Sequence, residues 1–292
     1  ALYLPKYKTA GLKELRQRRK SVASTLKVTS AMKMIAAGKL KKSQDNMIKA
    51  RPYSAKIREV MQMLVYGSES FTSDFFIKRT GDRTLYILVT SDKGLCGGFN
   101  ANIIKAFNSD FRPEMDQIIS VGNKISAHLA RREIVTEYSF VNAFSNFDFS
   151  LAASVGSMAI DLYKKNKIDR VILIYNRFES ALSQIVVREQ LLPVELEATP
   201  SKKANLAHAK ITAEPSPGEL FDSIFPRYVN YLIWRGLLES FASENAARMT
   251  TMDSATENAT EMFSTFTLQI NKARQAAITQ EISEIVSGSS FA

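Results

Sequence analysis

The sequence predicts an α/β domain combined with a long antiparallel coiled coil. Two long amphipathic stretches lie at opposite ends of the chain, and a segment of alternating strand and helix patterns separates them. Neither end can bury its apolar stripe locally, so we expect the N- and C-terminal helices to wind around each other as a coiled-coil shaft. The expected divisions are an N-terminal helix (1–66), a central α/β domain with a linker (67–218) and a C-terminal helix (219–292).

The N-terminal stretch has the seven-residue periodicity of a coiled-coil seam. In the two series of seven-residue spacing that start at Leu12 and Leu15, eleven of sixteen positions are apolar. Pro52 allows a kink or a break near Arg51 because proline removes one helical hydrogen bond. Without a break, residues 12–66 would extend over about 80 Å.

The C-terminal stretch follows Pro215, Pro217 and Pro226, after which the chain contains no proline. Its seam runs from Tyr231 to Glu284, and eleven of sixteen seam positions are again apolar. Residues 219–286 would extend over about 100 Å, so we expect this helix to exceed its partner by roughly 20 Å. The residues 287–288 (Ser-Gly) predict the helix end.

The end of this helix has an apolar face where its partner no longer reaches. The seam becomes polar at Gln280 and Glu284, because the apolar residues move to a different face of the helix. A helix end in water gains nothing from such a face, so it predicts an apolar collar supplied by another protein. The residues of this face are Ile278, Ile282, Ile285 and Val286.

The middle of the chain reads as βαβ units. Short β-branched runs favour buried parallel strands, and amphipathic segments between them favour helices. The expected strands are 84–90, 117–121 and 170–175, with weaker candidates at 134–138 and 184–187; the expected helices lie at about 99–111, 122–132 and 148–166.

Positive charge is concentrated at the N-terminus. Residues 1–58 contain 16 Lys and Arg but only two acids, whereas the whole chain has a net charge of +10. Three interpretations stay open: a solvated basic face, an acidic protein partner, or nucleic acid. No aromatic residue lies between Tyr7 and Tyr53, so stacking on bases is unsupported in this region.

The glycine-rich turn at 91–100 follows the first expected strand and opens a helix, where a doubly wound fold can hold a phosphate. It matches neither of the usual nucleotide-binding fingerprints, so we expect a tight turn that needs glycine conformations. The single cysteine, Cys96, is expected to be a small buried core residue.

The sequence carries no pattern typical of catalysis. The two histidines, His128 and His208, stand alone, and no carboxylate pair marks an acid/base site. We therefore expect no catalytic residue, no cofactor and no metal. No apolar run reaches the roughly 18–20 residues that span a bilayer, so we expect membrane contact only through a partner.

One polar segment precedes the apolar end of the C-terminal helix. Arg274 and Gln275 offer several hydrogen-bond donors beside the small residues Ala276 and Ala277. This segment is either an ordinary polar face or a polar contact with a surrounding protein, which the alanines would allow to approach closely.

Several segments resemble the gamma-subunit family of F-type ATP synthases. Four occur in the family's order, and together with the chain's ending they extend the resemblance from about residue 10 to the end. The matching segments are 27–39 (KVTSAMKMIAAGK), 91–98 (SDKGLCGG), 243–253 (SENAARMTTMD) and 271–281 (NKARQAAITQE), followed by 284–292 (EIVSGSSFA).

The resemblance implies a non-catalytic rotor subunit of the central stalk with a Rossmann-like middle domain. One copy would stand inside a hexamer of alpha and beta subunits and on the membrane c-ring, beside delta/epsilon-type subunits. Rotation of the c-ring would drive the beta catalytic sites through their conformations, and the chain itself would bind no nucleotide or nucleic acid. A basic coiled-coil nucleic-acid-binding protein is the alternative.

The resemblance also assigns residues to partners. Arg274, Gln275, Thr279 and Met32 fall where the family's shaft meets a beta subunit, and the apolar face at 278–286 falls in the hydrophobic sleeve of the hexamer. Glu214 is a weak candidate for contact with the c-ring. The absence of a cysteine-containing insertion argues against the light-regulated type. The first residue, Ala1, and the basic pI of about 9.5 favour the matrix side of the mitochondrial inner membrane, with the cytoplasmic face of a bacterial plasma membrane as the alternative.

Overall fold

The computed structural model describes residues 11–66, 73–145, 147–195 and 216–289. The chain divides into two compact units. The α/β unit comprises residues 36–248, and the coiled-coil unit comprises residues 1–35 together with 249–292.

The predicted long helices are both present and both cross from one unit to the other. Helix α1 spans Leu12–Tyr66 and continues through Pro52, so the possible break near Arg51 does not occur. Helix α6 spans Pro217–Ser289 and contains Pro226. The predicted stop at residues 287–288 is wrong, because the helix extends to Ser289.

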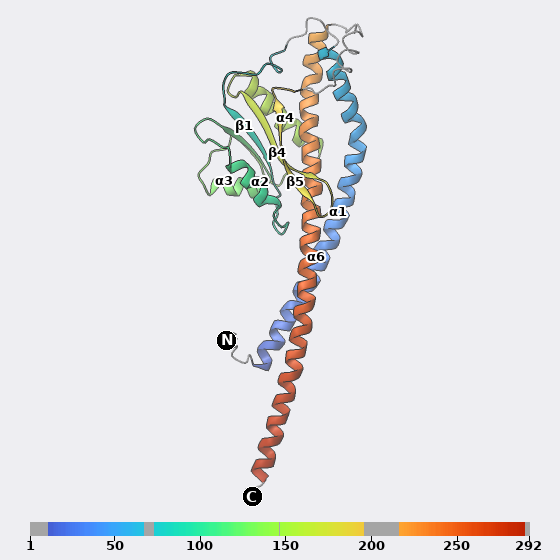
Figure 1. The fold of residues 1–292 in the computed structure, drawn as a ribbon, viewed down its shortest axis with the longest axis vertical. Helices are drawn as coiled ribbons and strands as arrows, with labels where there is room; N and C mark the ends of the chain where they lie inside the picture. Colours follow the sequence, from blue (N-terminus) through green and yellow to red (C-terminus); the bar gives the residue numbers. More distant parts are fainter. Residues whose placement is uncertain (1–10, 67–72, 146, 196–215, 290–292) are drawn as a thin grey trace, which may run out of the picture. The chain divides into compact units, whose positions relative to one another are not determined.

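A five-stranded sheet forms the centre of the α/β unit, in the order β3-β2-β1-β4-β5 (Figure 1). The strands β1, β2, β3 and β4 are mutually parallel, whereas β5 pairs antiparallel with β4 as a hairpin. The strands are β1 (Thr84–Val89), β2 (Gln117–Val121), β3 (Tyr138–Phe140), β4 (Arg170–Phe178) and β5 (Gln184–Leu192).

The predicted strands at 84–90, 117–121 and 170–175 are confirmed, and the weaker candidate at 184–187 is the start of β5. The candidate at 134–138 is displaced: β3 starts at Tyr138, where the chain first pairs with β2. The helices between the strands are α2 (Phe99–Asn108), α3 (Asn123–Ala130) and α4 (Phe149–Lys164).

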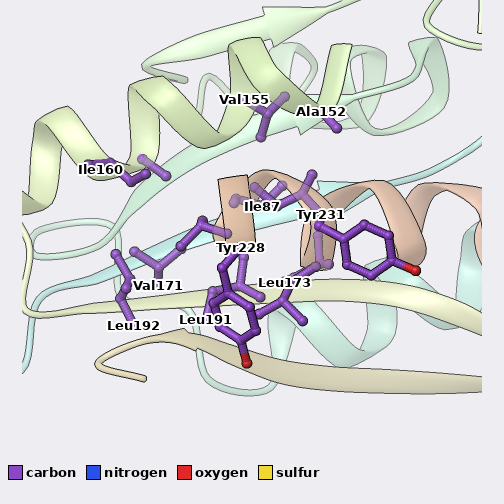
Figure 2. Packing of buried hydrophobic residues seen from close by; sticks show 14 of the residues in the cluster. Ile87, Ala152, Val155, Ile160, Val171, Leu173, Leu191, Leu192, Tyr228 and Tyr231 are labelled. Carbon is purple, nitrogen blue, oxygen red and sulfur yellow. The ribbon is translucent and has the colours of Figure 1, made fainter. Parts of the chain in front are cut away.

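The two faces of the sheet carry separate apolar clusters, because alternate residues of β1 point to opposite sides. Tyr86 and Leu88 pack with α2 and α3, whereas Leu85, Ile87 and Val89 pack with α4, the last turns of α1 and the first turns of α6. Figure 2 shows the second cluster, in which side chains of α4 and α6 gather over Ile87 and Leu173.

Two glycines allow α6 to lie close to the core. A Cβ atom on Gly236 would stand 2.6 Å from Leu173 Cδ2, and one on Gly156 of α4 would stand 1.9 Å from Asn230 Oδ1. The first part of α6 is therefore an integral layer of the α/β unit.

Within the coiled-coil unit, α1 and α6 run antiparallel. Arg19 lies over the ring of Phe263, the hydroxyls of Thr29 and Thr256 are 2.8 Å apart, and Lys33 pairs with Asp253. Partner numbers fall in α6 as they rise in α1, which is the antiparallel arrangement that the sequence predicts.

This register places the start of α1 opposite Ile270, the last buried residue of α6. The helices contain 55 and 73 residues, and the 18-residue difference corresponds to about 27 Å at 1.5 Å per residue. The unpaired length is greater than the predicted 20 Å in part because α6 ends at Ser289 rather than at residue 286.

Candidate functional site

The end of α6 exposes a continuous apolar stripe. All residues from 274 to 287 are exposed, so the polar and the apolar side chains of this segment both face solvent. Ile278, Ile282, Ile285 and Val286 have exposed fractions of 48–71%. Their spacing of four, three and one residues places them on one face of the helix. This stripe is the apolar end that the sequence predicts.

Arg274 and Gln275 precede the stripe, and Thr279 directly follows its first residue, Ile278. Arg274 lies one turn before Ile278, and the Thr279 hydroxyl donates to the backbone oxygen of Gln275 (2.9 Å). The hydroxyl is thus held by its own helix, whereas the guanidinium of Arg274 and the amide of Gln275 are on exposed residues. The arrangement offers two multi-donor side chains beside an apolar surface.

The predicted contact residue Met32 is partly buried in α1, but its neighbours are more exposed. Val28, Met34 and Ile35 have exposed fractions of 54, 67 and 60%. These three residues were not among the predicted contact residues. They lie outside the seven-residue seam, and this is the signal that could have identified them. Lysines at 27, 33 and 39 surround them, so the surface combines apolar and positive groups.

The glycine-rich turn lies where β1 ends, beside β4, at the position where doubly wound folds hold ligands. Gly97 has a φ of 55°, so the turn requires a glycine conformation as predicted. Leu95 also has a positive φ of 63°, and its side chain is exposed. Asn100 fixes the turn by accepting a hydrogen bond from the Ser91 backbone nitrogen (3.0 Å).

Helix α6 occupies this crevice from within the α/β unit. The Arg248 guanidinium donates to the backbone oxygens of Lys93 (3.3 Å) and Gly94 (3.2 Å), and it pairs with Glu244 at 2.7 Å. The Ser243 hydroxyl donates to the backbone oxygen of Asn176 (3.0 Å). Carbonyl oxygens of the turn after β1 and of β4 are thus bound by side chains of the chain's own helix.

Cys96 is buried, as predicted, and packs with Phe99 and Ala247. Burial raises the pKa of its thiol, although the neighbouring Ser91 hydroxyl opposes that shift. A raised pKa disfavours the thiolate, which is the reactive form. The geometry therefore gives Cys96 a packing role.

A half-open pocket of the α/β unit lies between the segment before β1, the end of α4 and the start of α6. Phe75, Tyr163 and Phe221 are among its lining residues. Arg79 also lines it, but its guanidinium donates to the backbone oxygens of Tyr163 and Ile168, both at 2.9 Å. The Arg79 guanidinium of this pocket is therefore already engaged in hydrogen bonds within the α/β unit.

Some predicted features lie outside the described residues. Glu214, His208 and the first nine residues belong to this group, and the structure describes nothing of them. Within the described ranges, no cluster of His, Cys, Asp and Glu could hold a metal ion. Within the same ranges, every helix is too short or too polar to cross a membrane.

Comparison with known proteins gives matches over almost the full chain. The family model described as ATP synthase matches residues 11–290. The ATP synthase gamma chain of Geotalea daltonii is 44% identical over 285 residues, which cover 96% of this chain and 98% of that protein. The gamma chain of Heliobacterium modesticaldum is 40% identical over 283 residues, covering 95% and 98%.

A similar solved structure is the central stalk and c-ring of the Tetrahymena thermophila mitochondrial ATP synthase. The matched chain is 27% identical, with a TM-score of 0.57. The match covers 78% of this chain and 99% of that one. The residues matched by the family model include both long helices and the sheet between them.

Proposed function

The chain belongs to the gamma-chain family of ATP synthases, and from this premise we propose how its surfaces act in the enzyme. It is the non-catalytic rotor subunit of the central stalk, which couples rotation of the c-ring to the conformational cycle of the beta catalytic sites. The match that includes both helices and the sheet is the observation that carries this function. The alternative of a nucleic-acid-binding protein finds no support in the comparisons.

The coiled-coil unit would stand inside the hexamer of alpha and beta subunits. One copy serves each complex, because an asymmetric shaft in a threefold shell must be single for the three sites to differ. The exposed stripe of α6 supports this placement, since the apolar sleeve of the hexamer would cover residues that otherwise face water.

We assign Arg274, Gln275 and Thr279 to contact with a beta subunit. A rotating helix needs weak, mostly apolar contacts with few polar ones, and this segment has only a few polar side chains on a slim, alanine-containing surface. The two exposed multi-donor side chains can form and release hydrogen bonds as the shaft turns.

Met32 and its exposed neighbours would face an acidic segment of a beta subunit. The lysines of α1 supply the complementary charge, and Val28, Met34 and Ile35 supply apolar area. An acidic protein partner would account for the excess of positive charge in residues 1–58.

The α/β unit would form the foot on the c-ring, beside the delta/epsilon-type subunits. Contact with the membrane would be indirect, through the ring. Glu214 stays a candidate for contact with the c-ring, and only the resemblance to the family supports this assignment. The bacterial relatives support the cytoplasmic face of a bacterial plasma membrane, whereas the basic composition favours the mitochondrial inner membrane; fractionation of the source cell distinguishes the two.

Native mass spectrometry of this chain, mixed with purified alpha and beta subunits, tests the proposal. We expect a complex of three alpha, three beta and one copy of this chain. Loss of Ile278, Ile282 and Ile285 by substitution with Asn should weaken that complex. A wild-type chain that fails to join subunits competent to bind another gamma chain would overturn the proposed partners.

A further inference from the structure

Two adjacent turns of α6 bind the backbone of the α/β core at three points. Ser243 donates to the Asn176 oxygen at the end of β4, and Arg248 donates to the Lys93 and Gly94 oxygens in the turn after β1. Asn176 in turn donates from its side chain to the Phe99 oxygen (3.3 Å), at the start of α2. Ser243, Glu244 and Arg248 are called the helix anchor below.

The backbone oxygens that accept these bonds belong to two separate segments, β4 and the turn after β1. Two separate attachment points can restrict rotation of the helix about its axis. Apolar packing alone lets a helix turn slightly about its own axis, because dispersion contacts have little directionality. Hydrogen bonds weaken steeply when their angles depart from linear. Bonds from adjacent turns to β4 and to the turn after β1 therefore help to fix the rotational angle of α6 in the α/β unit.

Burial makes these bonds stiff. The side chains of Arg248 and Glu244 are only 12% and 6% exposed, so water competes little for them. The bonds of Arg248 are charge-assisted, which makes them stronger than neutral ones. Glu244 holds the guanidinium in place with a 2.7 Å contact.

The position of the anchor in the chain gives it a mechanical meaning. Arg248 is the last residue of the α/β unit, and Met249 is the first of the C-terminal segment in the coiled-coil unit. Torque that enters α6 from the α/β unit must be transferred before this residue, because beyond it the helix belongs to the coiled coil.

We propose that the helix anchor is the torque-transfer point of the rotor: Arg248, positioned by Glu244, and Ser243 lock α6 to the sheet so that the two turn together. This inference rests on the proposed function. The crevice in which related doubly wound folds bind a nucleotide serves here as the seat of the chain's own shaft.

The test measures torsional stiffness in the assembled complex. Hexamers of alpha and beta subunits are fixed to a surface with the full chain inside. Ala127 is exposed, so an Ala127→Cys substitution supplies the thiol to which a bead is attached. Cys96 is buried, so the introduced thiol is the one that reacts. The angular fluctuation of the bead in the nucleotide-stalled complex reports the stiffness between α/β unit and coiled coil.

We compare Arg248→Gln and Ser243→Ala with Arg112→Ala. Arg112 is a matched control, since it also makes several bonds, to Asp82 and Asp116, but these lie at the opposite end of the strands. We expect a roughly twofold larger angular variance in Arg248→Gln, because two of the anchor's three directional bonds to the core backbone are lost. Ser243→Ala should give a smaller increase and keeps the test open if Arg248→Gln folds poorly. Arg248→Lys, which retains the charge, should restore part of the stiffness.

An unchanged variance in Arg248→Gln and Ser243→Ala would overturn the inference. An equal increase in Arg112→Ala would overturn it as well, because the change would then reflect general softening of the domain. Failure of the proposed function has a different signature: the wild-type chain would give no beaded complex at all.

Discussion

The two ends of α6 both carry apolar residues, but one end buries them and the other exposes them. Between residues 217 and 248 the helix is a layer of the α/β unit, with Phe221, Phe225, Val229, Ile233 and Leu237 buried. Between residues 274 and 287 it exposes an apolar stripe of similar chemistry. Hydrophobicity alone therefore does not separate core from contact surface; what separates them is whether the chain itself supplies a cover.

The buried segment of α6 serves the stability of the fold, whereas its exposed segment serves contact with partners. Burial of the first segment stabilises the fold, so its substitution should lower the free energy of unfolding. The second segment contributes almost nothing to the isolated chain, so its substitution should act only when partners are present. The predictions below test this division, in order of decreasing effect on stability.

Phe225→Ala should have the largest effect. Phe225 is buried and stacks on Phe75 with centroids 3.9 Å apart, so truncation leaves a cavity and costs about 3–5 kcal/mol. Phe263→Ala on the same helix is the matched control, because Phe263 is 37% exposed. Urea unfolding measures both. Equal losses in the two variants would contradict the claim that burial, and not hydrophobicity, decides the cost of substitution in α6.

Asp169→Asn tests the electrostatics of the α/β unit. The guanidinium of Arg83 donates to the buried Asp169 carboxylate (2.9 Å) and holds its pKa below the usual range. The ionised carboxylate thus stabilises the fold above its unfolded pKa, about 3.9, and this stabilisation is lost as pH falls through the lower, folded value. We expect a loss of about 1.5–3 kcal/mol at pH 7.

Urea unfolding of Asp169→Asn at several pH values supplies the check. The difference from the wild-type chain should shrink below about pH 4, where the wild type also loses its charge. Asp161→Asn, which removes an exposed pair with Lys165, should change stability little at any pH. A loss that stays constant between pH 7 and pH 3 would refute the electrostatic explanation.

Charge reversal at Lys33 should have a small effect. Lys33 pairs with Asp253 across the coiled-coil unit, but both side chains are about two-fifths exposed. Lys33→Asp should therefore destabilise the chain by about 1 kcal/mol or less, more at low salt than at high salt. The double exchange with Asp253→Lys should restore the wild-type value. Thermal melting at two salt concentrations measures this, and no rescue would place the pairing elsewhere.

Asn substitutions at Ile278, Ile282 and Ile285 should leave the stability of the free chain unchanged. These side chains already face water, so no apolar area is uncovered. The same triple variant should assemble poorly with alpha and beta subunits. Val135→Asn with Leu182→Asn is the control, since both residues are more than 80% exposed in the α/β unit. A lower melting temperature in the triple variant would mean that the chain covers its own stripe.

Periodicity was enough to predict both long helices, because a seven-residue apolar spacing has few other solutions. The parallel strands were predicted by short β-branched runs, and β1 is indeed buried at every position. The start of β3 was missed because it depends on pairing with β2 rather than on its own hydrophobic pattern. Helix ends depend on local hydrogen bonds, and this explains the extension of α6 past Gly288.

The candidate site could be predicted from the sequence only where apolar residues lie outside the coiled-coil seam. The apolar stripe stood out because its residues leave the seam, and the same signal would have identified the exposed Val28 and Ile35. The helix anchor was not predictable. Arg248 binds carbonyl oxygens more than 150 residues earlier in the chain, and backbone acceptors leave no trace in a sequence.

The central claim is that one copy of this chain turns inside the hexamer and that its exposed end is covered there. Single-molecule observation of a bead on the chain, in surface-fixed hexamers supplied with ATP, tests it most directly. We expect unidirectional rotation by the full chain, with weakened torque or assembly after truncation beyond Gln280. Hydrolysis without rotation of the full chain, or undiminished torque after truncation, would contradict it.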